Sequence, residues 1–201
     1  MVVVAPLSAE YIEGAVGLQR ACFPEPFPED LLWSADHLRA HLAKFPEGQF
    51  VALSDGRVVG SASNTIIAES VYQAHGSWTN TVGGPFLATF DAEGTTLYGL
   101  DISVHPEFRR RGVGRQLYEA RFELVRHRPG LQRYATACRL PGFWTWGGDL
   151  DDYLATVRRG ELDDRTLTPL LRMGLTLVEG LYDYMEDAES LNCAALLEWT
   201  P

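Results

Sequence analysis

The stretch DISVHPEFRRRGVGR, residues 101–115, decides the fold, and it has three parts. A strand-like apolar run, residues 97–104, leads through it to Pro106. A short basic loop with glycines follows, and apolar residues then recur at the spacing of one helical face, at Val113, Leu117, Ala120 and Leu124. The first turn of a helix has unpaired backbone N–H groups and a dipole that favours negative charge. Strand, glycine loop and helix start therefore predict a site for a phosphate or pyrophosphate group.

Two common phosphate loops do not fit this stretch. A nucleotide P-loop needs two glycines separated by four residues, followed by Lys and Ser or Thr, and the chain has no such run. A dinucleotide fingerprint needs a third glycine where Leu117 stands, and it follows the first strand of a βαβ unit. Here the loop lies in the middle of the chain, after hairpin-type strands. These differences argue against an ATPase, a GTPase or a nicotinamide enzyme.

The hexapeptide Arg109-Arg110-Arg111-Gly112-Val113-Gly114 resembles the Gln/Arg-x-x-Gly-x-Gly/Ala loop of the GNAT acetyltransferase superfamily. The resemblance implies that acetyl-CoA is the cosubstrate and that this loop holds its pyrophosphate through backbone N–H groups. It also implies that the preceding strand offers backbone groups to the pantetheine amides. The predicted cofactor-binding residues are Ile102, Ser103, Val104, Arg109, Arg110, Arg111, Gly112, Val113, Gly114 and Arg115.

The order of predicted elements is that of a GNAT domain with insertions. The expected class is α/β (α+β), with a mixed, mostly antiparallel central sheet and flanking helices, in one domain over residues 1–201. The resemblance implies that strands 97–104 and 131–140 splay apart and admit the pantetheine arm. Residues 68–94 lack a clear period and predict a long connection with a short helix near 69–73. The other expected elements are strands 2–5, 49–53, 57–67, 175–181 and 192–199, helices 12–22, 34–45, 112–128, 149–159 and 164–173, and a loop at Pro24, Pro26 and Pro28.

The whole chain resembles one subgroup, the acetyltransferase domain that is elsewhere fused to a carbon–nitrogen (nitrilase-type) hydrolase. One domain is expected to use the whole chain, so no nitrilase activity is implied. The segments that carry the likeness are residues 45–52, 97–99, 139–142, 153–162 and 194–199.

Composition narrows the classes of function. The formal net charge of -10 and the pI of about 4.9 argue against binding to nucleic acid or to an anionic membrane. Three separated cysteines, Cys22, Cys138 and Cys193, predict neither a disulfide framework nor a zinc site, and no metal is expected. Acidic residues at 149–152 and 163–164 are expected to cap helices. The apolar N-terminal run is too short for a signal peptide, so a soluble cytoplasmic protein is the default.

Amide formation from acetyl-CoA needs a neutral amine, so a proton acceptor is required. Side chains alternate along a strand, which places the even-numbered residues 98–104 on one face and Gly99, Asp101 and Ser103 on the other. In the resembled family, bases usually lie near position 98 or 100, so Tyr98 is the first candidate, as a proton relay. Its alternative is a core tyrosine. Asp101 is the second catalytic candidate, because a carboxylate in an apolar strand must be hydrogen-bonded or have a raised pKa. Its alternative is a structural carboxylate with a hydrogen-bonding partner.

One family feature is missing. Many GNAT enzymes carry a tyrosine that acts as general acid three or four residues before the glycine that ends the last helix. Here Gly174 is preceded by Leu170-Leu171-Arg172-Met173. The leading expectation is an N-acetyltransferase that acts by direct transfer on a primary amine of a small molecule or protein. The alternatives are a catalytically silent acyl-CoA sensor or scaffold and a transferase for longer acyl chains. Trp144 and Trp146 leave two roles open, an acceptor-pocket wall and a homodimer contact.

Overall fold

The computed structural model describes residues 1–25 and 29–201, so Pro26 and Pro28 of the expected proline loop lie outside the described residues. Within the described part, seven strands form one sheet in the order β1-β2-β3-β4-β5-β7-β6. The β4–β5 pair is parallel and the other neighbouring pairs are antiparallel, as expected for a mixed sheet. The strands are β1 (Val2–Pro6), β2 (Phe50–Ser54), β3 (Arg57–Ile67), β4 (Thr96–Val104), β5 (Arg133–Arg139), β6 (Thr176–Leu181) and β7 (Ala194–Trp199).

The helices agree with the sequence pattern in most places. A short helix is confirmed at residues 69–73, whereas a second one in the same connection, α4, was not predicted. Helix α2 begins after Ser34, close to the predicted start, and Ser34 caps it because its Oγ accepts the His37 N–H at 3.2 Å. The helices are α1 (Ile12–Cys22), α2 (Ala35–Lys44), α3 (Glu69–Gln73), α4 (Trp78–Val82), α5 (Val113–His127), α6 (Leu150–Arg158) and α7 (Leu167–Arg172).

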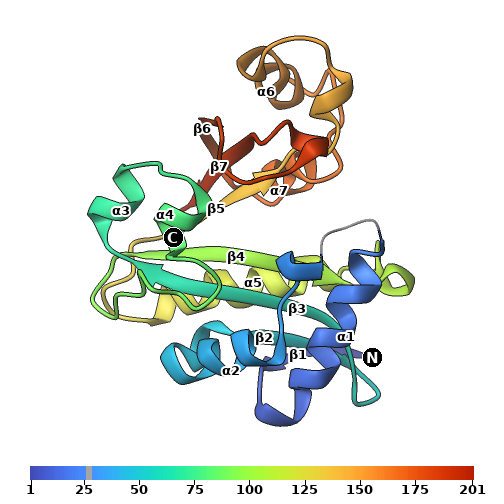
Figure 1. Ribbon diagram of the computed structural model, residues 1–201, viewed down its shortest axis with the longest axis vertical. Coiled ribbons are helices and arrows are strands. Elements are labelled where there is room, and N and C mark those ends of the chain that lie inside the picture. The colour runs from blue at the N-terminus through green and yellow to red at the C-terminus, as the bar shows by residue number, and fades with distance from the viewer. Residues whose placement is uncertain (26–28) are drawn as a thin grey trace.

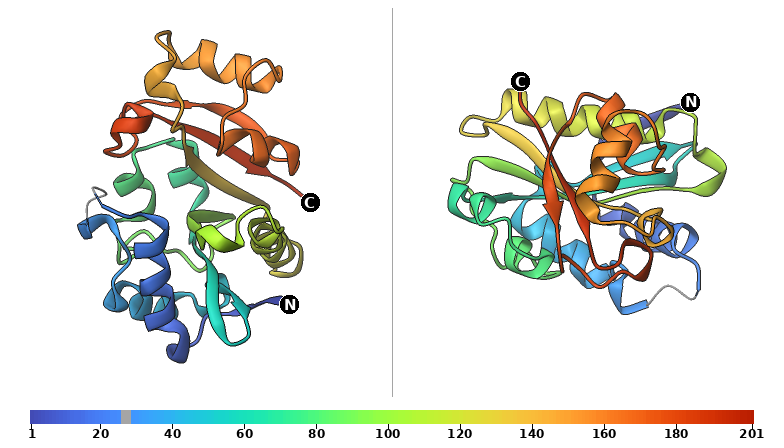
Figure 2. Two further views of the ribbon diagram at one scale, coloured as in Figure 1. Left: turned by 90° about the vertical axis from the view of Figure 1, so that its right-hand side faces the viewer. Right: turned by 90° about the horizontal axis from the view of Figure 1, so that it is seen from above.

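Helices cover both faces of the β1–β4 half of the sheet (Figures 1 and 2). Alternating side chains of β2 and β3 explain the two layers. Val51 and Val58 pack with the α1–α2 side, whereas Ala52 and Val59 pack against α5. In Figure 1, α1 and α2 lie in front of and below the strands, and α5 lies behind them.

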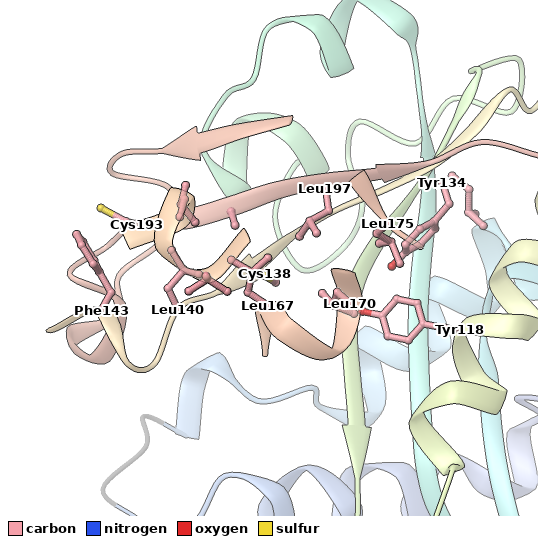
Figure 3. Packing of buried hydrophobic residues seen from close by; sticks show 14 of the residues in the cluster. Tyr118, Tyr134, Cys138, Leu140, Phe143, Leu167, Leu170, Leu175, Cys193 and Leu197 are labelled. Atoms are coloured by element: carbon pink, nitrogen blue, oxygen red, sulfur yellow. The ribbon is translucent and has the colours of Figure 1, made fainter. Parts of the chain in front are cut away.

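The β5–β7–β6 half of the sheet has its own helical cover, α6 and α7 (Figure 1), and Figure 3 shows Leu167 and Leu170 of α7 beside side chains of the strands. Leu167 and Leu170 of α7 are buried against side chains of β5 and β7, among them Cys138 and Leu197. The acids before these helices cap them as expected. Asp149 Oδ1 accepts the Asp152 N–H at 2.8 Å, and Asp164 Oδ1 accepts the Leu167 N–H at 2.7 Å.

The two halves of the sheet separate after Gly99. Parallel pairing of β4 with β5 runs from Thr96↔Arg133 to Gly99↔Thr136, and β4 continues to Val104 beyond it. Figure 1 shows β5 turning away from β4 towards β7. The predicted splay of these strands is therefore confirmed: among the described residues, β4 pairs with β3 up to Val104 but has no strand paired to its β5 side beyond Gly99.

A β-bulge in β4 changes which face of the sheet its side chains occupy. The β3–β4 register shifts between Ser63 and Asn64, which face Asp101 and Gly99, so Leu100 is an extra residue. The simple alternation expected from the sequence is therefore wrong from Asp101 onwards. Asp101 follows Tyr98 and Leu100 onto the α1 face, while Ile102 packs on the α5 side.

Gly99 lies where the pairing ends because a side chain at this position would collide with β5. A Cβ added to Gly99 would lie 2.1 Å from Tyr134 Oη. We predict that Gly99→Ala lowers the free energy of unfolding by about 1–3 kcal/mol, the usual range for overpacking. Urea unfolding measures this loss.

The control for Gly99→Ala is the double variant Gly99→Ala/Tyr134→Phe, which removes the colliding oxygen. It should recover most of the stability lost relative to Tyr134→Phe alone. Equal losses in both backgrounds would show that the contact with Tyr134 is not the cause.

Candidate functional site

The loop between β4 and α5 has the backbone shape of an anion cradle. Arg110 and Gly112 both have left-handed backbone conformations, with φ of 59° and 81°. Gly112 is the N-cap of α5, and within the described structure its position supplies no side-chain cap to the helix. The N–H groups of the first turn are therefore left for an external acceptor, and the helix dipole favours an anion there.

Gly114 is not required by the fold itself. A Cβ at this position would meet only Val104 Cγ2, at 3.9 Å, and no positive φ makes a side chain strained. A glycine that neither packing nor backbone geometry demands leaves space over the first turn of α5. That space lets a phosphate group approach the backbone closely.

The predicted arginines surround this cradle with different contacts. Arg109 Nε donates to Val104 O at 3.1 Å and so ties the loop to the end of β4. The Arg111 guanidinium lies 5.4 Å from the centre of the Phe108 ring, and Arg115 Nε lies 3.7 Å from Glu119 Oε1. The loop concentrates positive charge in a chain whose net charge is -10.

The predicted backbone contacts lie at the split between the strands. Ile102 and Val104 belong to the part of β4 that has lost its β5 neighbour, and both are half-buried on the α5 side. Ser103 points the other way and is 2% exposed, where its Oγ accepts Gln19 Nε2 at 3.0 Å. Ser103 can therefore contact a ligand at the β5 side of β4 only through its backbone, because its side chain is hydrogen-bonded to Gln19 on the α1 face.

Asp101 is a half-buried carboxylate held by neutral donors. Gln19 Nε2 donates to Asp101 Oδ2 at 2.8 Å and Ser103 Oγ donates to the same oxygen at 3.2 Å. Burial raises the pKa of the Asp101 carboxyl, although the Arg121 charge and the hydrogen bonds act in the opposite direction. A carboxyl with a raised pKa is a better proton acceptor than an ordinary one.

Tyr98 lies deeper, on the same face as Asp101. It is 2% exposed, and its Oη lies 3.0 Å from Tyr184 Oη. Burial raises the pKa of Tyr98 well above its usual value, so the phenol keeps its proton at neutral pH. Tyr98 can pass a proton along this pair, but it cannot act as a resident phenolate.

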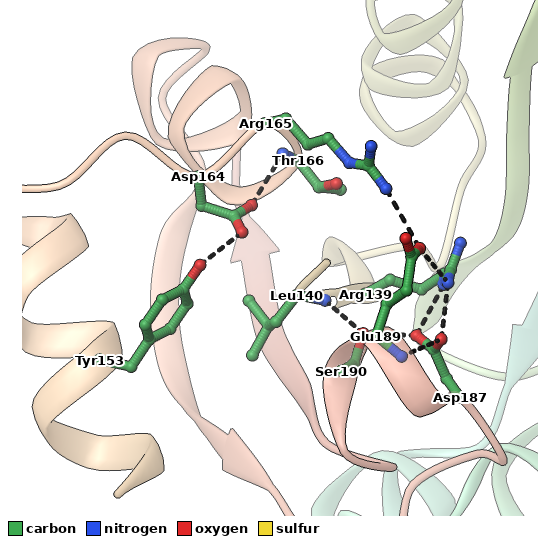
Figure 4. A network of polar contacts seen from close by, with 9 residues as sticks. All are labelled: Arg139, Leu140, Tyr153, Asp164, Arg165, Thr166, Asp187, Glu189 and Ser190. Atoms are coloured by element: carbon green, nitrogen blue, oxygen red, sulfur yellow. Dashed lines mark hydrogen bonds and ion pairs between the residues drawn. The ribbon is translucent and has the colours of Figure 1, made fainter. Parts of the chain in front are cut away.

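The loop between β6 and β7 is anchored to the end of β5 (Figure 4). Arg139 Nε and Nη2 donate to Asp187 Oδ2 and Oδ1 at 2.7 and 2.6 Å, a two-point contact. Burial alone would raise the pKa of Asp187, but the hydrogen bonds from Arg139 and Ser190 outweigh it and the pKa is lowered. The ion pair with Arg139 therefore holds the β6–β7 loop in place at neutral pH.

The exposed aromatic residues named from the sequence belong to the C-terminal half. Trp144 is 59% exposed, and Trp146 packs edge-on against Tyr153 at a centroid distance of 5.7 Å. The three cysteines are free thiols in the structure. Among the described residues, no group of three or more His, Cys, Asp and Glu side chains could hold a metal ion.

Sequence reasoning missed Gln19 and Arg121, which contact Asp101 from opposite faces. Both lie in apolar stripes. Gln19 follows buried Ala15 and Leu18 of α1, and Arg121 lies one turn after buried Leu117 of α5. A polar residue at a core-facing helical position is a signal that could have found them.

A family model described as the acetyltransferase (GNAT) family matches residues 12–143, which include the cradle and Asp101. The chain belongs to the GNAT acetyltransferase family. It is therefore an acyltransferase with acetyl-CoA as cosubstrate, as the loop motif implied.

Two relatives from Bacillus subtilis (strain 168) share most of the chain. An "Uncharacterized N-acetyltransferase YkwB" is 35% identical over 190 residues, 94% of this chain and 84% of its own length. A "Probable hydrolase YhcX" is 32% identical over 200 residues, 98% of this chain but only 38% of its own length. The second relative agrees with the resemblance to GNAT domains fused to hydrolases.

One solved structure is similar to this protein over almost the full length of both chains. It is described as "GphF GNAT-like decarboxylase in complex with isobutyryl-CoA", with a TM-score of 0.83, 23% identity and 98% coverage of both chains. This likeness concerns the fold, and it extends beyond residue 143 through α6, α7 and the closing strands. Among the described residues, no helix has both the length and the apolar character needed to cross a membrane.

The residues present fit the coenzyme A ester. The uncapped turn at Gly112, the open space at Gly114 and the unpaired edge of β4 provide a cradle for a pyrophosphate and an opening for an extended arm. When bound, the ester supplies the activated acyl group.

The cradle predicts that Gly114→Asp separates binding from folding. An acid in the first turn of a helix favours the helix, but here it would lie against the phosphates. We expect the thermal unfolding midpoint to stay equal or rise, while the affinity for coenzyme A falls by roughly a hundredfold or more, comparable with a lost charged hydrogen bond plus repulsion.

Calorimetry with coenzyme A and thermal unfolding measure the two effects of Gly114→Asp. Gly17→Ala in α1 is the matched control, because a Cβ there meets nothing within 4 Å. Unchanged coenzyme A affinity in Gly114→Asp would show that the pyrophosphate binds elsewhere.

Proposed function

We propose that this GNAT enzyme transfers the acetyl group of acetyl-CoA directly to a primary amine of a small molecule or protein, within a ternary complex. The observation that carries the proposal is the Asp101 carboxylate, placed by the bulge at the point where β4 leaves β5. It lies beside the predicted path of the pantetheine arm and has the raised pKa that an amine-deprotonating group needs.

The proposed reaction has four proton and bond changes. Asp101 accepts a proton from the incoming ammonium group, which frees the nitrogen lone pair. The neutral amine attacks the thioester carbonyl, and a backbone N–H of β4 stabilises the resulting oxyanion. The C–S bond then breaks, the CoA thiolate leaves, and the second nitrogen proton is transferred to the sulfur.

Tyr98 and Tyr184 are the proposed relay for the proton that reaches the sulfur. Their hydroxyl groups are in contact at 3.0 Å, and burial keeps both phenols protonated. This relay would replace the family tyrosine that is missing before Gly174, where α7 ends at Arg172.

The proton acceptor is tested with Asp101→Asn. Wild-type kcat/KM should rise with pH through the raised pKa of Asp101, because the carboxyl accepts a proton only when ionised. The variant should lose this acid limb and about 10²–10⁴-fold in kcat, the usual contribution of a general base. Release of coenzyme A with a panel of amines measures both effects.

Asp55→Asn is the matched control for Asp101→Asn. It makes the same isosteric change in the exposed turn between β2 and β3. If Asp101→Asn kept the wild-type acid limb, Asp101 would not be the proton acceptor.

Coenzyme A binding together with the release assay, and a separate assay for CO₂, distinguish two other functions. Coenzyme A binding without amine-dependent release would identify a silent sensor or scaffold, the reading that the missing tyrosine before Gly174 favours. Loss of CO₂ from malonyl-CoA would identify a decarboxylase, the activity named for the similar GphF structure. An ionised Asp101 beside the reacting carbon would repel the carboxylate of such a substrate, so we favour amine transfer.

A further inference from the structure

Arg121 is a buried arginine in the middle of α5. Arg121 is 1% exposed, and its guanidinium carbon lies 4.9 Å from the Tyr118 ring centre and 5.4 Å from that of Tyr134. Among the described residues, no carboxylate lies within ion-pair distance of it. A buried charge without such a partner is costly unless it makes good hydrogen bonds, so its contacts require an explanation.

The hydrogen bonds of Arg121 go to the β-bulge. Its Nη2 donates to Ser63 O of β3 at 3.2 Å and to Asp101 O of β4 at 2.5 Å. Ser63 and Asp101 face each other at the register shift that leaves Leu100 as the extra residue. A bulge disrupts the hydrogen-bond ladder between strands, and Arg121 supplies donors to one carbonyl from each strand.

Asp101 is consequently held from both faces of the sheet. Arg121 holds its carbonyl from the α5 side, while Gln19 of α1 holds its carboxylate at 2.8 Å. The peptide unit that carries Asp101 O also carries the N–H of Ile102, and a peptide unit is planar. Fixing the oxygen therefore fixes the direction of an N–H that is among the predicted contacts to the acyl-CoA.

Stability alone does not explain this side chain. Arg121 Nε is buried and has no hydrogen-bond partner in the part of the chain that the structure describes, and an unsatisfied buried donor destabilises a fold. Apolar residues often replace buried charged groups without loss of stability. The position thus carries a polar group that is only partly satisfied by the core.

We propose that Arg121 is a positioning residue for acetyl transfer: it holds the bulge so that the Asp101 carboxylate and the Ile102 N–H face the reacting groups together. The inference rests on the proposed function of Asp101 but concerns a residue that does not touch the substrate. It also gives the guanidinium a second effect, because its positive charge favours the ionised form of Asp101.

Few other groups can titrate near Asp101. From α1, the Cys22 thiol faces it, with Arg109 beyond that thiol, and burial raises the pKa of Cys22. From the α5 side, the phenols of Tyr118 and Tyr134 flank Arg121, and burial raises the pKa of both. These phenols and the thiol stay neutral in the range where Asp101 titrates, so Arg121 is the charged group to vary.

The test compares Arg121→Met, which removes the charge and the donors, with Arg121→Lys, which keeps the charge. Carboxyl ¹³C NMR follows Asp101, assigned with Asp101→Asn, and steady-state kinetics give kcat and KM for acetyl-CoA. In Arg121→Met we expect a higher Asp101 pKa, an acid limb moved to higher pH, and kcat lower by about tenfold or more. The KM for acetyl-CoA should change by less than about threefold.

Arg121→Lys should keep the Asp101 pKa near that of the wild type and recover most of kcat. If Arg121→Met does not fold, Arg121→Lys is compared in the wild-type and Asp101→Asn backgrounds, and the inference requires a smaller effect on kcat in the second. A lower unfolding midpoint with an unchanged Asp101 pKa and unchanged kcat per folded molecule would overturn the proposal.

The NMR measurement separates this inference from the proposed function. A wild-type protein without amine turnover would reject acetyl transfer, and a change of the Asp101 pKa in Arg121→Met would still support the inferred link between Arg121 and Asp101. Turnover with an Asp101 pKa that is insensitive to Arg121 would reject the link alone.

Discussion

The end of the β4–β5 pairing at Gly99 is the constraint on which the site depends. Tyr134 packs onto the bare α-carbon of Gly99, and Thr136 Oγ1 donates to Gly99 O at 3.1 Å. From there, β5 is committed to β7, and Arg139 ties its end to the β6–β7 loop. β4 pairs with β3, and its last residue, Val104, accepts a hydrogen bond from Arg109 in the loop before α5. Each strand is thus satisfied on its far side, which allows the near edges to remain unpaired beside a ligand.

The position of the split also determines the direction of the chemistry. The unpaired edge of β4 leads to the loop at the start of α5. There, the N–H groups of the first helical turn and several arginines lie together, although the protein as a whole is acidic. Asp101 lies at the opposite end of that edge, on the other face of the sheet. Under the proposed function, a donor held by its phosphates at one end would place its acyl group near the Asp101 carboxylate at the other end.

Local patterns predicted the elements whose stability is local. Gly112 before α5 and Asp55-Gly56 between β2 and β3 have left-handed backbone conformations, which restrict the residue type and can therefore be inferred from sequence. The phosphate-binding role of Gly112 and Gly114 stays a prediction. Helix α4 was missed because five residues carry too little periodicity, and a tertiary contact supports it: the Trp78 N–H donates to Tyr184 O at 2.8 Å. Serine is a favoured N-cap residue, so Ser8 is a natural candidate to cap the first helix. Its hydroxyl instead donates to Glu10 Oε1 and accepts no backbone N–H of the helix.

The bulge in β4 is the feature that local patterns could not give. The run Tyr98 to Val104 reads as an ordinary strand, because an extra residue changes the pairing partner and not the composition. The information lies in distant positions instead. Gln19 and Arg121 break the apolar stripes of two helices on opposite faces, and both contact Asp101. A polar residue in a core-facing stripe needs a polar partner, so two such residues together with one carboxylate in a buried strand indicate a single polar centre that crosses the sheet.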